Sequence, residues 1–360
     1  MPSQILHYLF GEDFFSEIRR RVTPMQDFSA GNVMGMIPDA HKSVFALGCQ
    51  GPDIFYHSRG RRPVGLEYGS LLHRRGMGAF MAGLLEMGIA KRRPGEGMNA
   101  LGAYALGFLT HAILDRYIHP YIVYKTAWLL PSNPAALRLD HSHVFFERII
   151  DVLMLKTLRG MDISAWDQEG FLSEICENPP SGLKELLARA LIHAFPERAG
   201  KDDKLLPRIE NTFHDCAFFY RLTAPSKTRN ADHRFFPLKM RHLVFLFPEE
   251  LPGHIDFLNL EKRPWFYPVG DEKEDLRSFP ELYAETVIKA ADLFTGIIGM
   301  YLTDGRFPFE DAARVIGDTG LSIVDEAGKP CAPNRSAPLP LDEVLVQQAA
   351  LRGLGGCEFA

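Results

Sequence analysis

The chain has 360 residues, of which 46% are hydrophobic and 24% are charged, and its formal net charge is −5. This composition is typical of a globular protein and excludes disordered, collagen-like and disulfide-scaffold proteins. The 40 basic and 45 acidic residues nearly balance, so there is no global positive charge to hold nucleic acid or an anionic membrane.

Cysteine spacing and the N-terminal sequence favour a cytoplasmic protein. The five cysteines are widely spaced without a CxxC pair, which argues against a disulfide framework and against a thiolate zinc site. The opening sequence, MPSQILHYLFGEDFF, lacks the basic start, the apolar stretch and the cleavage site of a signal peptide. The uncharged stretch at residues 99–114 is shorter than a bilayer span of roughly 20 residues, and it predicts a buried helix rather than a transmembrane segment.

The spacing of apolar residues predicts an all-α fold. Apolar positions recur about every 3.6 residues in the ranges 6–18, 71–85, 100–118, 143–158, 183–195 and 284–301. We expect Pro120 to end the third of these helices, because proline lacks the backbone N–H that a helix interior needs. Ser278 is the expected N-cap of the last helix, with Pro280 and Glu281 in its first turn. Residues 243–247 are the one candidate strand.

Histidine is concentrated in the first part of the chain. Eight of the thirteen histidines lie within the first 143 residues, close in sequence to several carboxylates. Imidazole and carboxylate are the ligands of zinc and other first-row metals. In GFLTHAILDRYIHP (107–120), His111 and Asp115 stand one helical turn apart and share a face, and His119 follows one turn later.

The next helix repeats this pattern. In DHSHVFFERIID (140–151), His143 and Glu147 are again four residues apart, and Asp151 lies one further turn along. A hydrogen-bonded core pair is the alternative for one such pair, but burying uncompensated polar groups costs roughly 2–7 kcal/mol. Two helices that each present histidine and carboxylate inward are typical of polynuclear metal sites in helical bundles. The sequence therefore predicts a metal site.

These motifs resemble those of the zinc-dependent phospholipase C family, in particular its unsecreted bacterial members. The resemblance depends on LGCQGPDIFYH (47–57), His73, LGFLTHAILDRYIHP (106–120) and HSHVFFERIID (141–151), in that order. It implies a multi-helix bundle of the phospholipase C and single-strand nuclease type, with a polynuclear zinc site between helices. We expect a zinc-binding helical core in residues 1–160, additional helices in 161–305, and a Pro-rich C-terminal tail with a short helix in 306–360.

The resemblance implies two to three zinc ions and their ligands. The implied sets are Asp53, His73, His111 and Asp115 for the first ion; His119, His143 and Glu147 for the second; and His7 with a bridging Asp115 for the third. Asp53 is also the implied general base, and Asp151 would orient a ligand without touching metal. In secreted members the N-terminal residue completes the third site, whereas six residues precede His7 here, so the occupancy of that site stays open.

The implied activity is hydrolysis of a phosphodiester by metal-activated water. The implied substrate is a phospholipid or a related soluble phosphoester. One alternative is a nuclease on the same scaffold, for which Phe55 and Tyr56 are candidates for stacking on a base. The other alternative is a non-catalytic helical module that is stabilised by its metals. No stable complex with nucleic acid is expected.

Other residues near the motifs have two interpretations each. His57 competes with His73 for the role of ligand, whereas His41 and His141 are expected at the surface or beside the ligands. Arginine can bind phosphate through two parallel hydrogen bonds, and candidates for this role are Arg59, Arg74 and Arg75, unless they belong to solvated loops. The basic stretch 221–241, which contains Phe235 and Phe236, is either a transient contact with an anionic lipid surface or an ordinary exposed loop.

Overall fold

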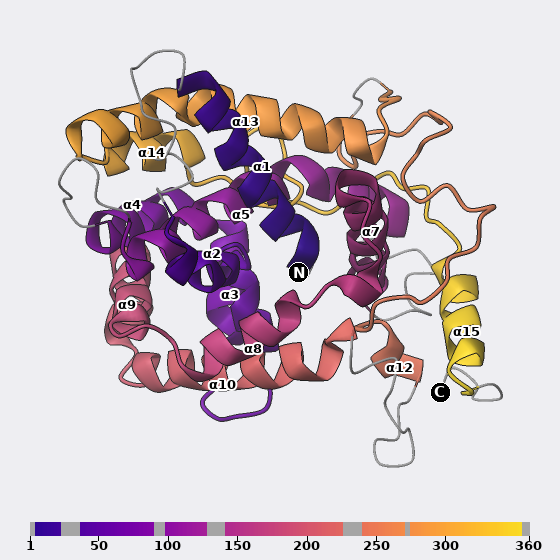
Figure 1. Ribbon diagram of the computed structural model, residues 1–360, viewed down its shortest axis with the longest axis horizontal. Helices are drawn as coiled ribbons and strands as arrows, with labels where there is room; N and C mark the ends of the chain where they lie inside the picture. The colour runs from indigo at the N-terminus through magenta and orange to yellow at the C-terminus, as the bar shows by residue number, and fades with distance from the viewer. Residues whose placement is uncertain are drawn as a thin grey trace.

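The computed structural model describes residues 4–22, 37–89, 98–127, 141–225, 240–270 and 274–354, and these residues form an all-helical structure (Figure 1). The predicted all-α class is confirmed. In this part of the chain β-structure is limited to two isolated bridges, Trp265 with Asp275 and Val324 with Pro330. The candidate strand at 243–247 does not form: a short helix ends there at Leu243, and a turn follows.

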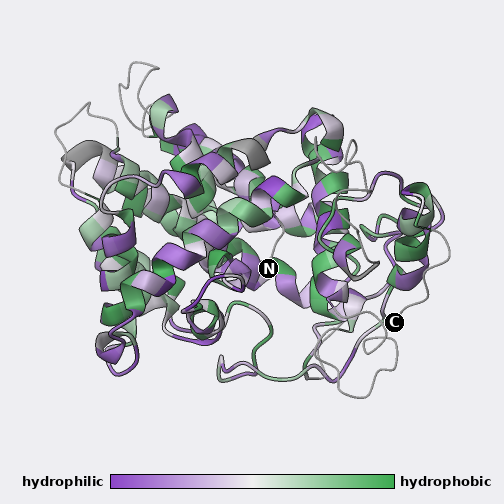
Figure 2. Ribbon diagram, turned by 90° about the horizontal axis from the view of Figure 1, so that it is seen from below, coloured by the Kyte–Doolittle hydropathy of each residue, from purple (hydrophilic) through white to green (hydrophobic). Residues whose placement is uncertain are grey.

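Several 3-10 helices lie between the α-helices of the described residues. The helices are α1 (Gln4–Val22), α2 (Lys42–Gly48), α3 (Leu66–Arg74), α4 (Met77–Gly88), α5 (Ala100–Thr126), α7 (Ser142–Arg159), α8 (Gln168–Glu177), α9 (Leu183–Ala194), α10 (Leu205–Thr223), α12 (Met240–Leu243), α13 (Phe279–Asp304), α14 (Phe309–Ile316) and α15 (Leu341–Leu351). The 3-10 helices are η3 (Asp39–His41), η4 (Gly51–His57), η5 (Ile163–Ala165) and η6 (Ala199–Lys201). Hydrophobic and hydrophilic residues alternate along most of these ribbons, as expected for amphipathic helices around a common core (Figure 2).

Helix α5 is the centre of the fold. It contacts α1, α2, α4, α7, α13 and α14, and nearly all of its residues are buried. In Figure 1 it lies between α13 along one edge of the molecule and α10 along the opposite edge. The apolar run at 99–114 therefore forms the buried helix that the sequence predicts. No helix among the described residues is long and apolar enough to cross a membrane.

The prediction that Pro120 ends this helix is wrong, because α5 continues through Pro120 to Thr126. A proline inside a helix costs about 3 kcal/mol. The last turns bury large side chains, and the Tyr121 ring packs against the rings of Trp265 and Phe279 at 5.3 and 5.4 Å between centroids. This burial offsets the lost hydrogen bond.

Glycines allow α2 and α5 to approach unusually closely. A Cβ atom on Gly48 would lie 2.2 Å from the Tyr104 carbonyl oxygen, and one on Gly107 would lie 2.4 Å from the Phe45 carbonyl oxygen. Real Cβ atoms do not approach so near, so only glycine permits this contact. The close approach places Cys49, at the end of α2, directly against α5.

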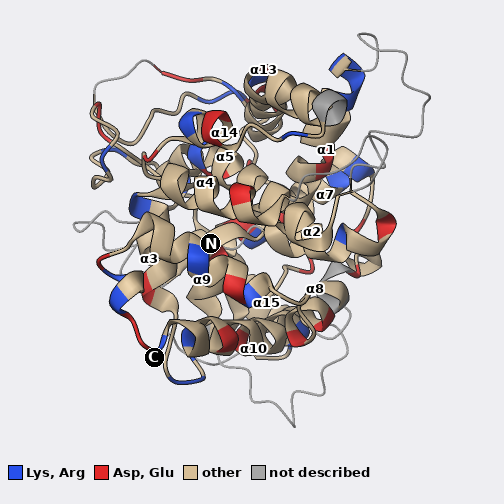
Figure 3. Cartoon of the chain, turned by 90° about the vertical axis from the view of Figure 1, so that its left-hand side faces the viewer, with Lys and Arg blue, Asp and Glu red and all other residues tan. Residues whose placement is uncertain are grey.

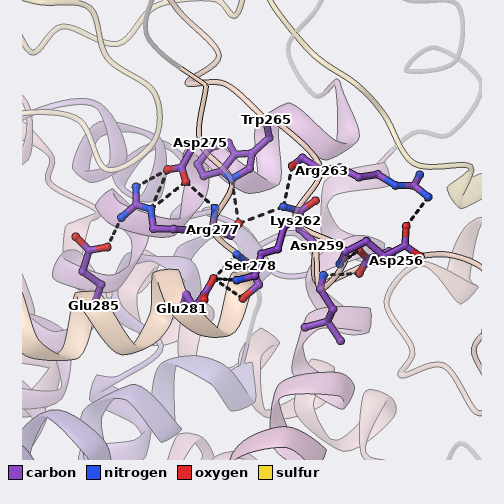
Figure 4. Close-up of polar contacts among 12 residues, drawn as sticks. Asp256, Asn259, Lys262, Arg263, Trp265, Asp275, Arg277, Ser278, Glu281 and Glu285 are labelled. Carbon is purple, nitrogen blue, oxygen red and sulfur yellow. Dashed lines mark hydrogen bonds and ion pairs between the residues drawn. The ribbon is translucent and has the colours of Figure 1, made fainter.

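Polar contacts fix the start of α13, which packs along α1 (Figure 4). Ser278 is the N-cap expected from the sequence, with Pro280 and Glu281 in the first turn, and the structure shows that Ser278 and Glu281 form a capping box. Just before the cap, Arg277 donates from Nε to both carboxylate oxygens of Asp275 at 3.0 Å, and it also pairs with Glu285. These contacts fix the long loop before α13 and thereby support the helix against which α1 lies.

The helix after the Pro-rich segment, α15, packs into the core, whereas the Pro-rich segment itself is mostly exposed or half-buried. Leu341, Val344 and Leu345 of α15 are buried in the main hydrophobic cluster. Upstream, the backbone N–H groups of Ala337 and Leu339 donate hydrogen bonds to carbonyls in the last turn of α5 at 2.9 and 2.8 Å. The segment is therefore fixed by backbone contacts with residues more than 200 positions earlier.

Candidate metal centre

Helix η4 brings Asp53 to the centre of the molecule. Its first residue, Gly51, has a φ of +54°, and a Cβ atom there would lie 2.3 Å from Cγ of His111. Only glycine therefore allows the His111 ring to pack against this turn. Two residues later Asp53 is buried, and its Oδ1 lies 3.1 Å from Nε2 of His73 on α3.

Backbone carbonyls orient two of the imidazole rings. Nδ1 of His111 lies 3.0 Å from the Cys49 carbonyl oxygen, and Nδ1 of His73 lies 2.8 Å from the Gly69 carbonyl oxygen. A carbonyl only accepts, so in each pair the imidazole donates from Nδ1, which leaves Nε2 as the ring nitrogen that could bind a metal. A metal-binding histidine typically has this arrangement.

Asp115 lies between four imidazole rings. Its Oδ1 is 3.2 Å from Nε2 of His7 and 3.5 Å from Nε2 of His119. Its Oδ2 is 3.3 Å from Nε2 of His111 and 3.5 Å from Nε2 of His73. The carboxylate is buried, yet neither oxygen accepts a hydrogen bond from any residue that the structure describes.

These separations suit ligands that share a metal ion. In a tetrahedral zinc site with bonds of about 2.0–2.1 Å, two ligand atoms lie about 3.3–3.4 Å apart. The nitrogen and oxygen atoms around Asp115 have this spacing but not the alignment of hydrogen bonds. The chemistry and spacing of these residues are therefore compatible with a bound metal ion.

The pKa shifts favour the metal-binding protonation states of Asp115 and His7, but not that of His73. Burial raises the pKa of the Asp115 carboxyl group, but the charges of His119 and His111 outweigh it and hold this pKa well below its usual value. Burial and the charge of His111 lower the pKa of His7 to about 4. Burial lowers the pKa of His73, but the carboxylates of Asp115 and Asp53 raise it to about 9, so a metal that binds there displaces a proton.

Among the described residues, two sets of three ligand atoms lie within 4.8 Å of one another. One set is His7, His111 and Asp115, and the other is Asp53, His73 and His111. Their members come from α1, η4, α3 and α5, which are far apart in the sequence. The structure thus brings together the residues that the resemblance implies for the first and third ions, and buried His/Asp groups that could hold a metal are present.

The residues implied for the second ion are less closely grouped. Nε2 of His119 lies 3.4 Å from Oε1 of Glu147. His143 is buried on α7 one turn before Glu147, and burial holds its pKa well below the usual value, whereas burial raises the pKa of Glu147. None of the three belongs to the two sets above. This second set of ligands stays a prediction.

Asp151 acts on the site through the backbone of α1. Its Oδ1 accepts a hydrogen bond from the N–H of Leu6 at 2.9 Å, in the turn that carries His7. The same turn receives two further contacts that sequence reasoning missed. The side-chain amide of Gln50 donates to the carbonyl of Gln4 at 3.2 Å, and Arg148 donates to the Gln4 side chain at 2.8 Å. The position of Arg148, a charged residue inside the apolar run of α7, is the signal that could have revealed its contact.

Replacing Asp151 should therefore loosen His7. We expect Asp151→Ala to lower the free energy of unfolding by about 1–3 kcal/mol, because the buried N–H of Leu6 loses its acceptor. Metal affinity should fall about 10- to 100-fold, as for other residues that support a ligand. Urea denaturation and a metal titration measure the two effects. Asp162→Ala, which removes an exposed partner of Lys156, is the control and should change neither. Unchanged metal affinity in Asp151→Ala would contradict the positioning role.

The structure separates the two histidines that competed for the ligand role. His57 stacks on Phe219 at 3.9 Å between ring centroids, and burial lowers its pKa to about 3. His57 belongs to neither set of ligand atoms, whereas His73 belongs to the set with Asp53 and His111. His141 packs against other rings, and His41 lies in η3.

The candidate substrate contacts have different surroundings. Phe55 is fully buried against Tyr68 and has no exposed face for a base. The Tyr56 ring lies 5.0 Å from the ring of His73, beside the candidate metal centre.

The candidate phosphate-binding arginines are exposed. Arg59 donates a hydrogen bond to the Tyr56 carbonyl. Exposed Arg74 and Arg75 follow His73 at the end of α3. Of the basic stretch 221–241, residues 226–239, including Phe235 and Phe236, lie outside the described residues.

Comparison of the chain with models of protein families, with curated proteins and with solved structures finds no match. A function for this chain therefore has to be argued from the chemistry of the site.

Proposed function

We propose that the chain is a zinc-dependent phosphodiester hydrolase of the phospholipase C type. The observation that carries this proposal is the surroundings of Asp115, a buried carboxylate with two imidazole nitrogens near each oxygen and a hydrogen bond at neither. Leaving such groups uncompensated is costly. Two adjacent zinc ions that share Asp115 as a bridge would satisfy both oxygens and the nitrogens around them.

The residues of the chain have separate roles in this proposal. His73 and His111 hold metal through Nε2, while their Nδ1 atoms stay bonded to backbone carbonyls that fix the rings. Bound zinc would lower the pKa of a water molecule toward 7 and neutralise charge on the phosphate. Asp53 lies beside His73 and would be the general base for that water.

Elemental analysis of the purified protein, before any chelator is added, is the test. We expect two to three zinc ions per chain. Removing them should lower the melting temperature, because bound metal stabilises only the folded state, and adding zinc back should restore it. Absence of stoichiometric metal after zinc is restored would contradict the proposal and leave the histidines as a core network.

Activity assays then separate the candidate functions. The zinc-loaded protein should release phosphocholine from phosphatidylcholine vesicles or hydrolyse the soluble diester bis(p-nitrophenyl) phosphate. Cleavage of single-stranded DNA alone would favour the nuclease, for which the burial of Phe55 removes one expected stacking residue. Bound zinc without any hydrolysis would indicate a structural role.

A further inference from the structure

A second polar feature adjoins the helix that carries His73. A cleft of about 1070 Å³ lies between the end of α3 and the segment 318–332. Arg74 and Arg75 line it from α3, Lys329 lines it from the later segment, and Asp318 is its one acidic residue. Figure 3 views the molecule from the side on which α3 and α4 lie. The walls of the cleft come from parts of the chain about 250 positions apart.

The cleft carries an excess of positive charge, because three cationic residues and one carboxylate line it. The carboxylate of Asp318 accepts a hydrogen bond through Oδ1 from the N–H of Ala79 at 3.1 Å and forms no ion pair with the three cations. Arg74, Arg75 and Lys329 form no ion pair with any described residue. Many other arginines of this chain are paired with carboxylates, for example Arg198 with Glu67 just beyond the cleft. Three unpaired cations therefore face one open space.

The later wall of the cleft is held in place by hydrogen bonds. Oδ1 of Asp325 accepts from the N–H groups of Ala327 and Lys329 at 2.9 Å each. The hydroxyl of Tyr267 bonds to both backbone groups of Val324, at 3.0 and 3.2 Å. The position of Lys329 relative to the arginines is therefore fixed by the fold rather than by a flexible loop.

The same segment is anchored to the metal centre. The N–H of Leu321 donates to the carbonyl oxygen of His73 at 2.9 Å. Arg74 directly follows His73. One short stretch of α3 therefore contributes His73 to the candidate metal centre and Arg74 to the cleft.

We propose that this cleft binds a phosphate group of the substrate other than the one that is hydrolysed. Arginine binds phosphate through two parallel hydrogen bonds, and lysine adds a compact point charge. The role in substrate binding depends on the hydrolase function proposed above. It predicts a preference for diesters whose head group carries an additional phosphate over diesters with a neutral or zwitterionic head group.

Arginine labelling tests the binding site without requiring turnover. Phenylglyoxal modification of the full chain is followed by peptide mapping, with and without millimolar inorganic phosphate, in zinc-loaded and in chelator-treated protein. We expect phosphate to slow the modification of Arg74 and Arg75 at least about threefold in both forms. Exposed Arg61 and Arg62 lie outside the cleft and should react at an unchanged rate. Equal rates with and without phosphate, or equal protection of all four arginines, would overturn the proposal.

Kinetics test the role in substrate selection. The variant Arg74→Gln/Arg75→Gln/Lys329→Gln should raise KM about tenfold or more for a diester with an additional phosphate, with a smaller change in kcat. The variant Arg189→Gln/Lys204→Gln/Arg306→Gln removes the same charge from exposed positions outside the cleft and should leave KM unchanged. An equal rise in KM in both variants would contradict the site.

Two substrates distinguish a lipid source of the phosphate from a soluble source. One is a phosphorylated lipid in vesicles, and the other is the deacylated, soluble diester with the same head group.

The two proposals can fail separately. Protection of Arg74 and Arg75 without hydrolysis of any diester would refute the hydrolase and leave an anion-binding cleft. Hydrolysis without protection would refute the cleft and leave the hydrolase.

Discussion

Asp115→Asn should remove both zinc binding and phosphodiester hydrolysis. An amide has one oxygen and no charge, so it cannot bridge two cations in the way that the two oxygens of Asp115 can. We expect zinc affinity to fall by more than about 100-fold, the upper end of the loss seen when a mere supporting contact is removed, and activity to fall with it. Elemental analysis after dialysis and a diester hydrolysis assay measure the two effects.

Thermal unfolding distinguishes this loss from misfolding. The variant no longer buries a carboxylate without hydrogen bonds, so its metal-free form should still fold and unfold cooperatively. Adding zinc should not raise its melting temperature. Asp292→Asn makes the same chemical change at an exposed position that pairs with Arg21, and it should keep the parent's zinc content and activity. Full activity in Asp115→Asn would show that Asp115 is not the bridging ligand.

Spacing along single helices predicts the helical parts of the site. His111 and Asp115 share a face of α5 because they stand four residues apart. The structure shows that this face is buried and points at other histidines. An amphipathic pattern is local, so one sequence suffices to recognise it. Local reasoning also finds the N-cap of α13, Ser278, because proline and glutamate follow it in the first turn.

Contacts between distant segments are not predictable in this way. No local signal pairs Cys49 with His111, because their hydrogen bond depends on how closely α2 and α5 approach. Pro120 gives a clear local signal to stop a helix, but burial of the residues after it outweighs that signal. The Pro-rich segment before α15 has the composition of an appendage, and only the structure shows that its backbone is hydrogen-bonded to the last turn of α5.

Gly107→Ala should both destabilise the protein and weaken the metal centre. The new Cβ atom would lie 2.4 Å from the Phe45 carbonyl oxygen and 2.7 Å from the backbone nitrogen of Cys49, so α2 has to move. Overpacking of a core costs typically about 1–3 kcal/mol, and we expect the upper end because the clash is with backbone atoms. His111 lies one turn after Gly107. The shift also draws the Cys49 carbonyl oxygen away from Nδ1 of His111, so the His111 ring loses the hydrogen bond that orients it.

Urea denaturation of the metal-free protein isolates the packing cost, and a zinc titration of the folded fraction isolates the effect on His111. Gly296→Ala is a matched control, because Gly296 also lies inside a long helix, α13, but a Cβ atom there meets open space. This control should gain about 0.5–1 kcal/mol from the better helix propensity of alanine and bind zinc normally. If Gly107→Ala instead resembled Gly296→Ala in both measurements, the close contact between α2 and α5 would not be what orients His111.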